Sequence, residues 1–295
     1  SGLNYLADVL AYNTHYNAVN AHFSMNESFL DSAQIRSNVV SRANLISYTP
    51  RSRRGPRATV NLKFPRQPGS DVETLILQRG TTFSTTLDGQ SYIFSTREDY
   101  EAPYNTSTRL FEFNGITIVQ GRLEQRNFLV NSATINQRFV IDDINIDVST
   151  LEVVVRNHKD ATSGKTYLNG DLFTSYDSES KVYFLSETNN GKYQLAFGDG
   201  IIGKKLDNLN VIEASFLSSA GGLPNGAKSF NFITTPDFAD FNVIAGASKL
   251  ETVEASYGGD ERESIESIRQ VAPQAFIAKN RVVTTTDYEA LIKKN

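Results

Sequence analysis

Four residues in the middle of the sequence, Ser163-Gly164-Lys165-Thr166, end like a phosphate-binding loop. In such a loop an earlier glycine lets the backbone wrap the phosphates, and a helix follows the lysine and the hydroxyl residue. Lys159 occupies the position of that earlier glycine, and Asn169-Gly170 predicts a turn where the helix would run. We therefore expect an ordinary hairpin loop here and no bound nucleotide or other cofactor.

Residues that could bind a metal ion are few. The sequence has no cysteine and three histidines, His15, His22 and His158. His15 and His22 are seven positions apart, whereas a helical zinc pair needs a spacing of four. The turn Phe197-Gly198-Asp199-Gly200 offers one carboxylate, and a calcium loop needs several at alternating positions. The sequence therefore predicts no metal site.

Groups for covalent or acid–base catalysis are also scattered. The G-x-S-x-G pattern of a serine nucleophile is absent from the sequence. Carboxylate pairs such as Glu98-Asp99 and Asp142-Asp143 are typical of solvated loops, and no spacing brings two of them to the separation that glycoside hydrolysis needs. We therefore expect a protein that is not an enzyme.

Composition narrows the class further. The length of 295 residues suits two or three domains with a substantial core. The net charge of −4, with nearly balanced signs, argues against general binding to nucleic acid or to an anionic membrane. No apolar run approaches the roughly 20 residues that span a bilayer. No signal peptide is visible, and the lack of cysteine excludes disulfides, so a cytosolic, non-secreted protein fits best.

The two ends of the sequence also predict its context. The chain begins at Ser1-Gly2 without an initiator methionine and stops at Lys293-Lys294-Asn295 inside a helical pattern. We expect it to be an excised piece of a longer protein.

The first element that the pattern predicts is a helix over residues 3–23. Six apolar side chains alternate spacings of four and three and therefore lie on one stripe. They are Tyr5, Val9, Tyr12, Tyr16, Val19 and Phe23. Two interpretations are open: the helix packs on its own domain by this stripe, or one of its faces meets a neighbouring subunit.

Small and polar residues of the same helix favour the second interpretation for its other faces. Ala7, Ala11 and Ala18 form a face that lets another helix approach closely. Beside the aromatic stripe runs a row of three asparagines, which can fix register when a polar contact is buried between chains. They are Asn13, Asn17 and Asn20. We expect these six residues to contribute to a subunit interface.

A second helix and a basic connector follow. Asp31 or Ser32 is expected to cap that helix, which should end near Tyr48-Thr49-Pro50 because a residue before proline is pushed out of the helical region. The connector carries four arginines, Arg51, Arg53, Arg54 and Arg57. One such cluster without interleaved aromatics is weak support for nucleic-acid binding. We expect these arginines to form salt bridges to acidic partners, and we add them to the expected subunit interface.

From residue 58 to about 248 the pattern changes to strands. Residues 58–64, 111–113 and 116–119 alternate with a period of two. Turn dipeptides recur between such runs. These are Asp88-Gly89, Asn114-Gly115, Asn169-Gly170, Asn190-Gly191 and Asn225-Gly226. The pattern predicts a β-rich body of antiparallel or sandwich-like sheets without a long helix, with a division into two subdomains near 105–110 as an option.

Helices are expected again after the strands. Gly258-Gly259 breaks the last strand, and Asp260 with Glu263 three residues later fits a helix start. Pro273 and Lys279-Asn280 predict a bend and a stop. A strand near Arg281-Val282-Val283 and a second helix start at Thr286 with Glu289 should follow.

The fold class is therefore predicted as α+β and multidomain. We expect N-terminal helices and the connector in residues 1–57, the β-rich body in 58–248, and a truncated helix-strand-helix segment in 249–295.

Segments along nearly the whole chain resemble the baseplate J-like family of contractile phage tails. Their order and spacing make the match specific, although each is short. They are Leu6–Thr14, Glu27–Leu30, Arg79–Phe83, Tyr92–Asp99, Val182–Leu185, Phe197–Gly203, Gly221–Ala227, Gly258–Arg269 and Thr284–Leu291. The N-terminal arm and C-terminal region expected of a whole member are absent from this sequence.

The resemblance implies a structural, non-enzymatic subunit of a baseplate wedge. Several copies would form a ring between wedges around the tail hub and rearrange when the sheath contracts. The implied partners are further copies in a dimer or ring, together with other wedge and hub proteins. The implied location is the tail baseplate of the virion, assembled in the host cytoplasm. The alternative is a host-facing glycan-binding or wall-degrading tail component, which the absence of tryptophan disfavours.

Overall fold

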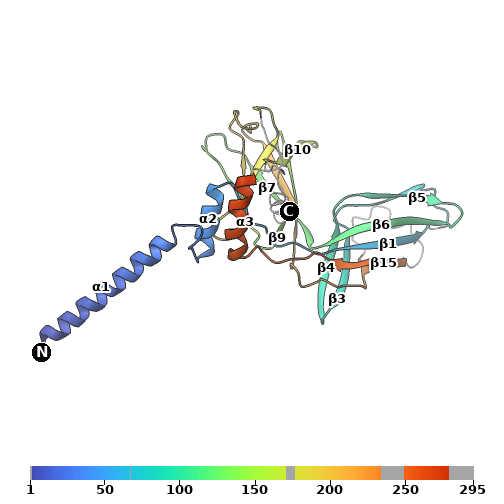
Figure 1. Cartoon of the computed structure of the whole chain (residues 1–295). Coiled ribbons are helices and arrows are strands. Elements are labelled where there is room, and N and C mark those ends of the chain that lie inside the picture. The colour runs from blue at the N-terminus through green and yellow to red at the C-terminus, as the bar shows by residue number, and fades with distance from the viewer. Residues whose placement is uncertain (1, 67, 171–176, 234–248, 279–295) are drawn as a thin grey trace.

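The computed structural model describes residues 2–66, 68–170, 177–233 and 249–278. This part of the chain contains three helices and two β-sheets, so the fold is α+β, as predicted. A long helix projects from one end of the molecule, and one sheet extends from the other end (Figure 1). The second sheet and a pair of short helices lie between them. The predicted strand at 281–283 and the helix start at 286 lie outside the described residues.

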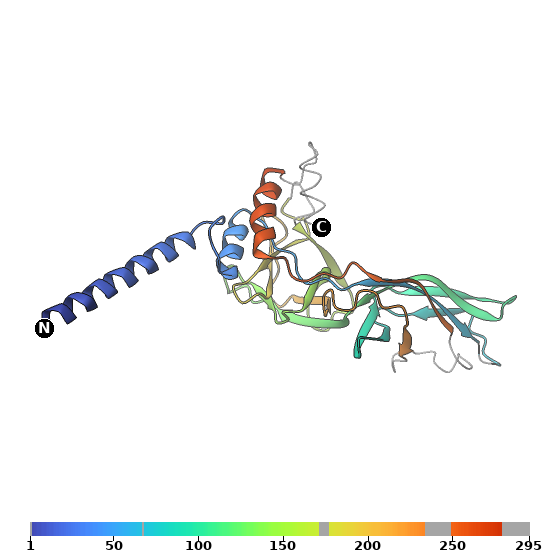
Figure 2. The same cartoon turned by 60° about the horizontal axis from the view of Figure 1, so that its bottom comes forward.

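Helix α1 (Gly2–Asn26) stands away from both sheets in the two views (Figures 1 and 2). It confirms the predicted helix over 3–23 and extends it by one residue at its start and three at its end. None of its residues is buried. The expectation that the aromatic stripe packs on the protein's own domain is therefore wrong, because the nearest core is completed by two other helices.

Those two helices are α2 (Arg36–Leu45) and α3 (Ile265–Ala278), which lie side by side although they come from opposite ends of the sequence (Figure 1). Their contact is a small apolar core that also includes the segment before α2 and the one after it. Its buried members are Ala33, Val39, Val40, Ala43, Tyr48, Ile268, Val271 and Ala272. The pair thus joins the N-terminal and C-terminal segments into one unit.

The helix α2 is shorter than the sequence pattern predicts. It begins at Arg36, preceded by Ile35, which makes no side-chain cap. The hydroxyl of Ser32, one of the expected caps, instead donates to the Asn26 carbonyl at 2.6 Å and closes the end of α1. The prediction of a cap at Asp31 or Ser32 is wrong because this loop is used to join the two helices.

The expected start of α3 is also wrong. The helix begins at Ile265, and the Ser264 hydroxyl accepts the Ser267 N–H at 3.1 Å as its cap. Asp260 pairs by backbone hydrogen bonds with Arg54, and Glu263 is buried among tertiary partners. Pro273, expected to mark a bend, lies inside the helix, where it removes one backbone donor without ending it.

The eight-stranded sheet forms the extended end of the molecule. Its strand order is β14-β3-β4-β6-β1-β15, and the antiparallel pair β2–β5 joins it through β6. The strands are β1 (Arg57–Pro65), β2 (Thr74–Leu77), β3 (Thr82–Leu87), β4 (Gln90–Thr96), β5 (Tyr100–Asn105), β6 (Leu110–Gln120), β14 (Asn231–Ile233) and β15 (Lys249–Tyr257). Alternate residues of β1 are buried, as the period of two predicts.

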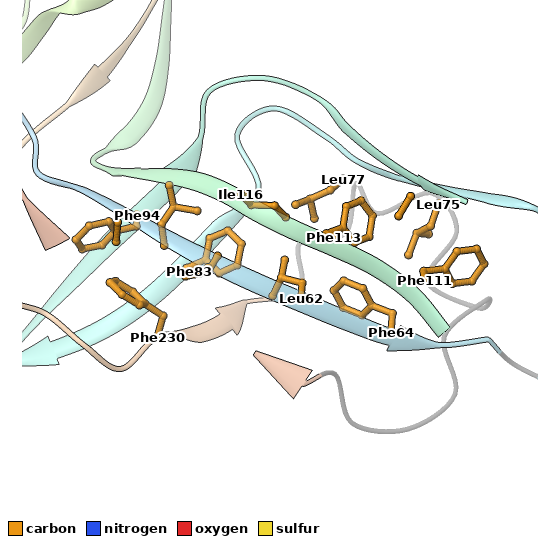
Figure 3. Close-up of a cluster of buried hydrophobic side chains, with 14 of the residues drawn as sticks. Leu62, Phe64, Leu75, Leu77, Phe83, Phe94, Phe111, Phe113, Ile116 and Phe230 are labelled. Carbon is orange, nitrogen blue, oxygen red and sulfur yellow. The ribbon is translucent and has the colours of Figure 1, made fainter. Parts of the chain in front are cut away.

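One apolar core lies along this sheet. Figure 3 shows aromatic and aliphatic side chains from β1, β2, β3, β4 and β6 gathered with Phe230. Phe94 and Phe230 meet edge to face with ring centroids 4.9 Å apart. This core accounts for the many phenylalanines in and beside the strands of this sheet.

The seven-stranded sheet has the order β7-β13-β9-β10-β11-β12-β8. Its strands are β7 (Arg122–Leu129), β8 (Phe139–Ile141), β9 (Ile146–Arg156), β10 (Gly164–Asn169), β11 (Val182–Glu187), β12 (Tyr193–Phe197) and β13 (Val211–Ser218). Neighbouring strands are antiparallel except β10 and β11, which run parallel. A second core, which includes Tyr193 and Phe216, covers one face of this sheet.

The turn dipeptides have mixed outcomes. Asp88-Gly89 joins β3 to β4 with φ of 50° and 78°, as a two-residue hairpin turn requires. Asn190-Gly191 lies between β11 and β12, as predicted. Asn114-Gly115 is not a turn, because β6 runs through it. Gly115 has φ of 71° there, and the pairing with β1 shifts by one residue, which is a β-bulge.

The chain crosses between the two sheets at several points. Residues 52–56 lead from α2 into β1, and the Gly55 N–H donates to the buried Asp147 carboxylate of β9 at 2.9 Å. Gly121 separates β6 from β7, with φ of 139°. The domain limits expected from the sequence stay a prediction. One sheet contains strands from both sides of the expected limit at residue 248, because β15 pairs with β1.

Candidate assembly surface

The aromatic stripe of α1 is exposed along its whole length. Its side chains are between 47% exposed, at Phe23, and 72% exposed, at Tyr5. Tyr12 and Tyr16 stack along the helix with ring centroids 6.1 Å apart. Leu3, Leu6 and Leu10 widen the apolar surface near the start of the helix and are also exposed. A stripe of this length is typical of a helix that another helix covers.

The spacing of the stripe agrees with that interpretation. From Tyr5 to Phe23 the intervals are four, three, four, three and four residues, the pattern of the buried seam in a coiled coil. The sequence separation covers nearly three heptads. A helix that is surrounded by water on all sides does not require a continuous stripe of apolar side chains.

Interactions within α1 contribute little to its stability. Its 25 residues include one charged side chain, Asp8, with no acidic group in the first turn and no basic group in the last. It therefore gains nothing from ion pairs between successive turns or from charges at its ends. Most helical stability in proteins comes from tertiary packing, which α1 does not receive from the other described residues of the chain.

The alanine face and the asparagine row lie where the sequence placed them. At 100° per residue, Ala7, Ala11 and Ala18 fall nearly opposite the aromatic stripe, and the asparagines fall beside it. All six residues are exposed. The Asn17 amide approaches the Asn13 side-chain oxygen at 3.4 Å, within the row itself. Their participation in a subunit interface stays a prediction.

Two arginines of the connector, Arg51 and Arg53, have acidic partners in their own chain. Arg53 forms a salt bridge with Glu261 at 2.9 Å and donates to the Asn145 side chain at 2.8 Å. Arg51 lies 3.9 Å from the Asp260 carboxylate. Arg57 is exposed at the start of β1. Arg51 and Arg53 therefore help to hold the segment after β15 against the connector, and their contact with another subunit stays a prediction.

A buried polar network joins the segment after α2 to the segment before α3. The Tyr48 hydroxyl donates to the Glu263 carboxylate at 2.9 Å, and the Arg51 N–H reaches the same carboxylate at 2.9 Å. Burial, with the neighbouring Glu263 charge, raises the pKa of Tyr48 far above its usual range, so the phenol stays protonated as a donor. This network connects the connector to the start of α3.

A second buried carboxylate links the helices to a sheet. Glu187, at the end of β11, accepts two hydrogen bonds of 3.1 Å from the guanidinium of Arg36 in α2. Arg262, just before α3, lies 3.8 Å away. Sequence reasoning missed both Glu187 and Glu263 as tertiary anchors. The available signal was weak, because a glutamate that pairs across more than 100 positions shows no local pattern.

The segments considered above for phosphate binding and for calcium binding form a strand and a turn. Residues 164–169 form β10, antiparallel to β9, so Lys165 and Thr166 lie in a strand where a phosphate loop would need a helix. The Asp199 carboxylate accepts the N–H groups of Ile201 and Ile202 at 2.8 and 2.9 Å. These bonds lower the pKa of Asp199 and confirm the predicted turn.

Within residues 2–66, 68–170, 177–233 and 249–278, histidine, aspartate and glutamate side chains form no group of three or more that could hold a metal ion. None of the helices in these ranges is long and apolar enough to cross a membrane.

Comparison with known proteins finds a relative that matches the whole chain. No family model matches, so membership of the J-like family stays a resemblance. The chain is 26% identical over 315 aligned positions to the baseplate wedge protein gp6 of Enterobacteria phage T4, a match that includes all of this chain. It spans 46% of that relative's length.

A solved structure was also matched. It is the cryo-EM structure of the baseplate of the anti-feeding prophage, which shares 16% identity over 95% of this chain and 49% of the other. The TM-score between the two structures is 0.31. The resemblance read from the sequence is confirmed by the first match: this chain is similar, from end to end, to about half of a phage baseplate wedge protein.

Proposed function

We propose that this chain is part of a structural, non-enzymatic subunit of a contractile-tail baseplate wedge. Its location would be the tail baseplate of the virion, with assembly in the host cytoplasm. Its partners would be further copies of itself, in a dimer or ring between wedges, and other wedge and hub proteins. The ring would shift its contacts when the sheath contracts. Similarity to a wedge protein over the whole chain supports this role.

The observation that carries the proposal is the exposed helix α1. A protein that acts alone does not keep a 25-residue helix in water with six apolar side chains on one stripe. In an assembly, another helix covers this stripe and supplies the packing that α1 lacks. The asparagine row beside it sets the register, and the alanine face lets a further helix approach closely.

The buried carboxylates of the described residues favour a structural role over the glycan-binding or wall-degrading alternative. Glu27, Asp147, Glu187 and Glu263 are the buried acidic side chains in these ranges. Each accepts hydrogen bonds from groups of its own chain. A hydrolase would keep a carboxylate pair open to a sugar.

Sedimentation of a stripe variant tests the proposal. Val9→Ala with Tyr16→Ala removes two seam side chains, and alanine is the best helix former, so the helix itself gains propensity. Each large apolar side chain contributes about 1.5–3 kcal/mol when fully buried. The double variant should therefore weaken self-association by about a hundredfold or more.

Leu45→Ala provides the matched control. Leu45 is 74% exposed on α2, away from the stripe, so its truncation should leave association unchanged. Equal association constants for the wild-type chain and the Val9→Ala, Tyr16→Ala variant would contradict the proposal. A wild-type chain that stays monomeric at high concentration would restrict the stripe to contacts with other baseplate proteins, and the same variants would then be assayed against purified wedge components.

A further inference from the structure

The loop between α1 and α2 is organised around one side chain, Glu27. This residue directly follows the last residue of α1, and its N–H still donates to the Phe23 carbonyl at 2.9 Å. Although it lies beside a fully exposed helix, Glu27 is only 7% exposed. Its carboxylate is therefore directed into the protein at the point where α1 meets the rest of the chain.

The Glu27 carboxylate accepts hydrogen bonds from several donors at the start of α2. The backbone N–H of Gln34 donates to Oε1 at 2.8 Å, and that of Ile35 lies 3.3 Å from Oε2. The Asn38 side-chain amide donates to Oε2 at 2.7 Å. Because Ile35 provides no side-chain cap of its own, Glu27 takes over that role from the preceding helix. A negative charge at a helix start is also favourable.

Helix α3 holds the same loop from its other side. The Arg269 guanidinium donates to the carbonyl of Ala33, which is fully buried. Its positive charge also acts on the Glu27 carboxylate. The Ala33 N–H donates to the Phe29 carbonyl at 3.0 Å, which adds a backbone hydrogen bond between two residues of the loop. The end of α1, the start of α2 and the middle of α3 thus meet at one polar junction.

We propose that Glu27 is a positioning residue that sets the direction in which α1 projects from the α2–α3 pair. The helix is about 37 Å long at 1.5 Å per residue. A change of about 20° at the junction would displace its far end by about 13 Å, enough to lose a side-chain seam. A fixed direction presents the stripe to a partner at a lower entropic cost than a freely moving helix would have. The functional part of this inference rests on the proposed role of α1; the geometric part does not.

Spin-label distances in the isolated chain test the geometric part. The sequence contains no cysteine, so Ala7→Cys on α1 and Gln270→Cys on the exposed side of α3 give a unique label pair. Labelled chain is diluted with unlabelled chain so that only distances within one molecule are measured. The wild-type background should give one narrow distance distribution.

Three substitutions in this background separate the outcomes. Glu27→Ala removes every acceptor and should replace the narrow distribution by a broad one. Glu27→Gln keeps one acceptor oxygen for three donors and should give an intermediate width. Asp31→Ala removes an exposed carboxylate from the same loop and should leave the distribution unchanged.

Circular dichroism of each variant separates loss of direction from loss of fold. A broad distribution with unchanged helix content and melting temperature supports the positioning role. If Glu27→Ala fails to fold, Glu27→Gln decides the matter. A wild-type distribution in the folded variants would overturn the inference, whatever sedimentation shows about assembly through the stripe.

Discussion

Removal of the Glu187 carboxylate should destabilise the protein strongly. Its side chain is 1% exposed and accepts both hydrogen bonds from Arg36, while Arg262 lies 3.8 Å away. Glu187→Ala leaves these two guanidinium groups without their shared partner. Loss of one member of a buried ion pair costs about 3–5 kcal/mol, and the two arginines are about a quarter exposed, so water compensates in part. We expect a loss of about 3 kcal/mol, at the low end of that range.

Urea unfolding measures this loss. Tyrosine fluorescence and circular dichroism serve as signals, because the chain has no tryptophan. At a slope of about 3 kcal/mol per M, the midpoint should fall by about 1 M. Glu179→Ala is the matched control, since its ion pair with Lys204 is 2.6 Å long but the glutamate is 75% exposed. That variant should lose at most about 1 kcal/mol. Equal midpoint shifts for the two variants would refute the assignment of Glu187 as an anchor of α2.

Three further predictions concern the helix, the joint between the sheets and the loop junction. Ala11→Glu with Ala18→Glu should weaken self-association in sedimentation while the melting temperature stays nearly constant, because exposed helical substitutions cost little; unchanged association would place the interface elsewhere. Gly121→Ala should lower the unfolding midpoint more than Gly115→Ala, because a β-carbon at Gly121 would meet Leu217 and Ser218 at 2.9 Å while that at Gly115 has open space; the reverse order would contradict this. Hydrogen bonds from Asn38 and from the Gln34 backbone hold the pKa of Glu27 below its ordinary 4.5. The Glu27 carboxylate therefore contributes stability above its unfolded pKa, and this contribution is lost as pH falls through its folded pKa. The distribution of spin-label distances in the wild-type chain should consequently broaden in acid. The distribution in Glu27→Gln should not change with pH.

The regular parts of the fold follow from local patterns. The spacing of four and three predicted α1, and alternation predicted β1, because each pattern reflects one repeating geometry. Asp88-Gly89 predicted its hairpin because few residues adopt positive φ at low cost.

Elements that depend on distant partners were not predictable in this way. The fit of Asp260 and Glu263 to a helix start was local, whereas Glu263 is bound by Tyr48 and Arg51 from the other end of the chain. Asn114-Gly115 became a bulge because β6 continues along β1 on both sides of it. Of the two interpretations of the aromatic stripe, packing on the protein's own domain was wrong, since an amphipathic pattern indicates that a face is to be covered but not by which chain.

For the candidate surface, the sequence located the helix and its three faces but not the parts that orient it. Glu27 belongs to the segment that resembles the baseplate family, yet its role depends on donors seven to eleven residues later and on Arg269 of α3. A loop without regular structure carries no periodic signal, so only the folded chain brings these groups together.

We expect α1 to become buried when the protein is assembled. Hydrogen exchange of the backbone amides of residues 2–26, measured by mass spectrometry on the free protein and on the assembled baseplate, tests this most directly. We expect fast exchange in the free protein, where the other described residues bury none of the helix, and strong protection in the assembly. Equal exchange of these amides in the two states would contradict it.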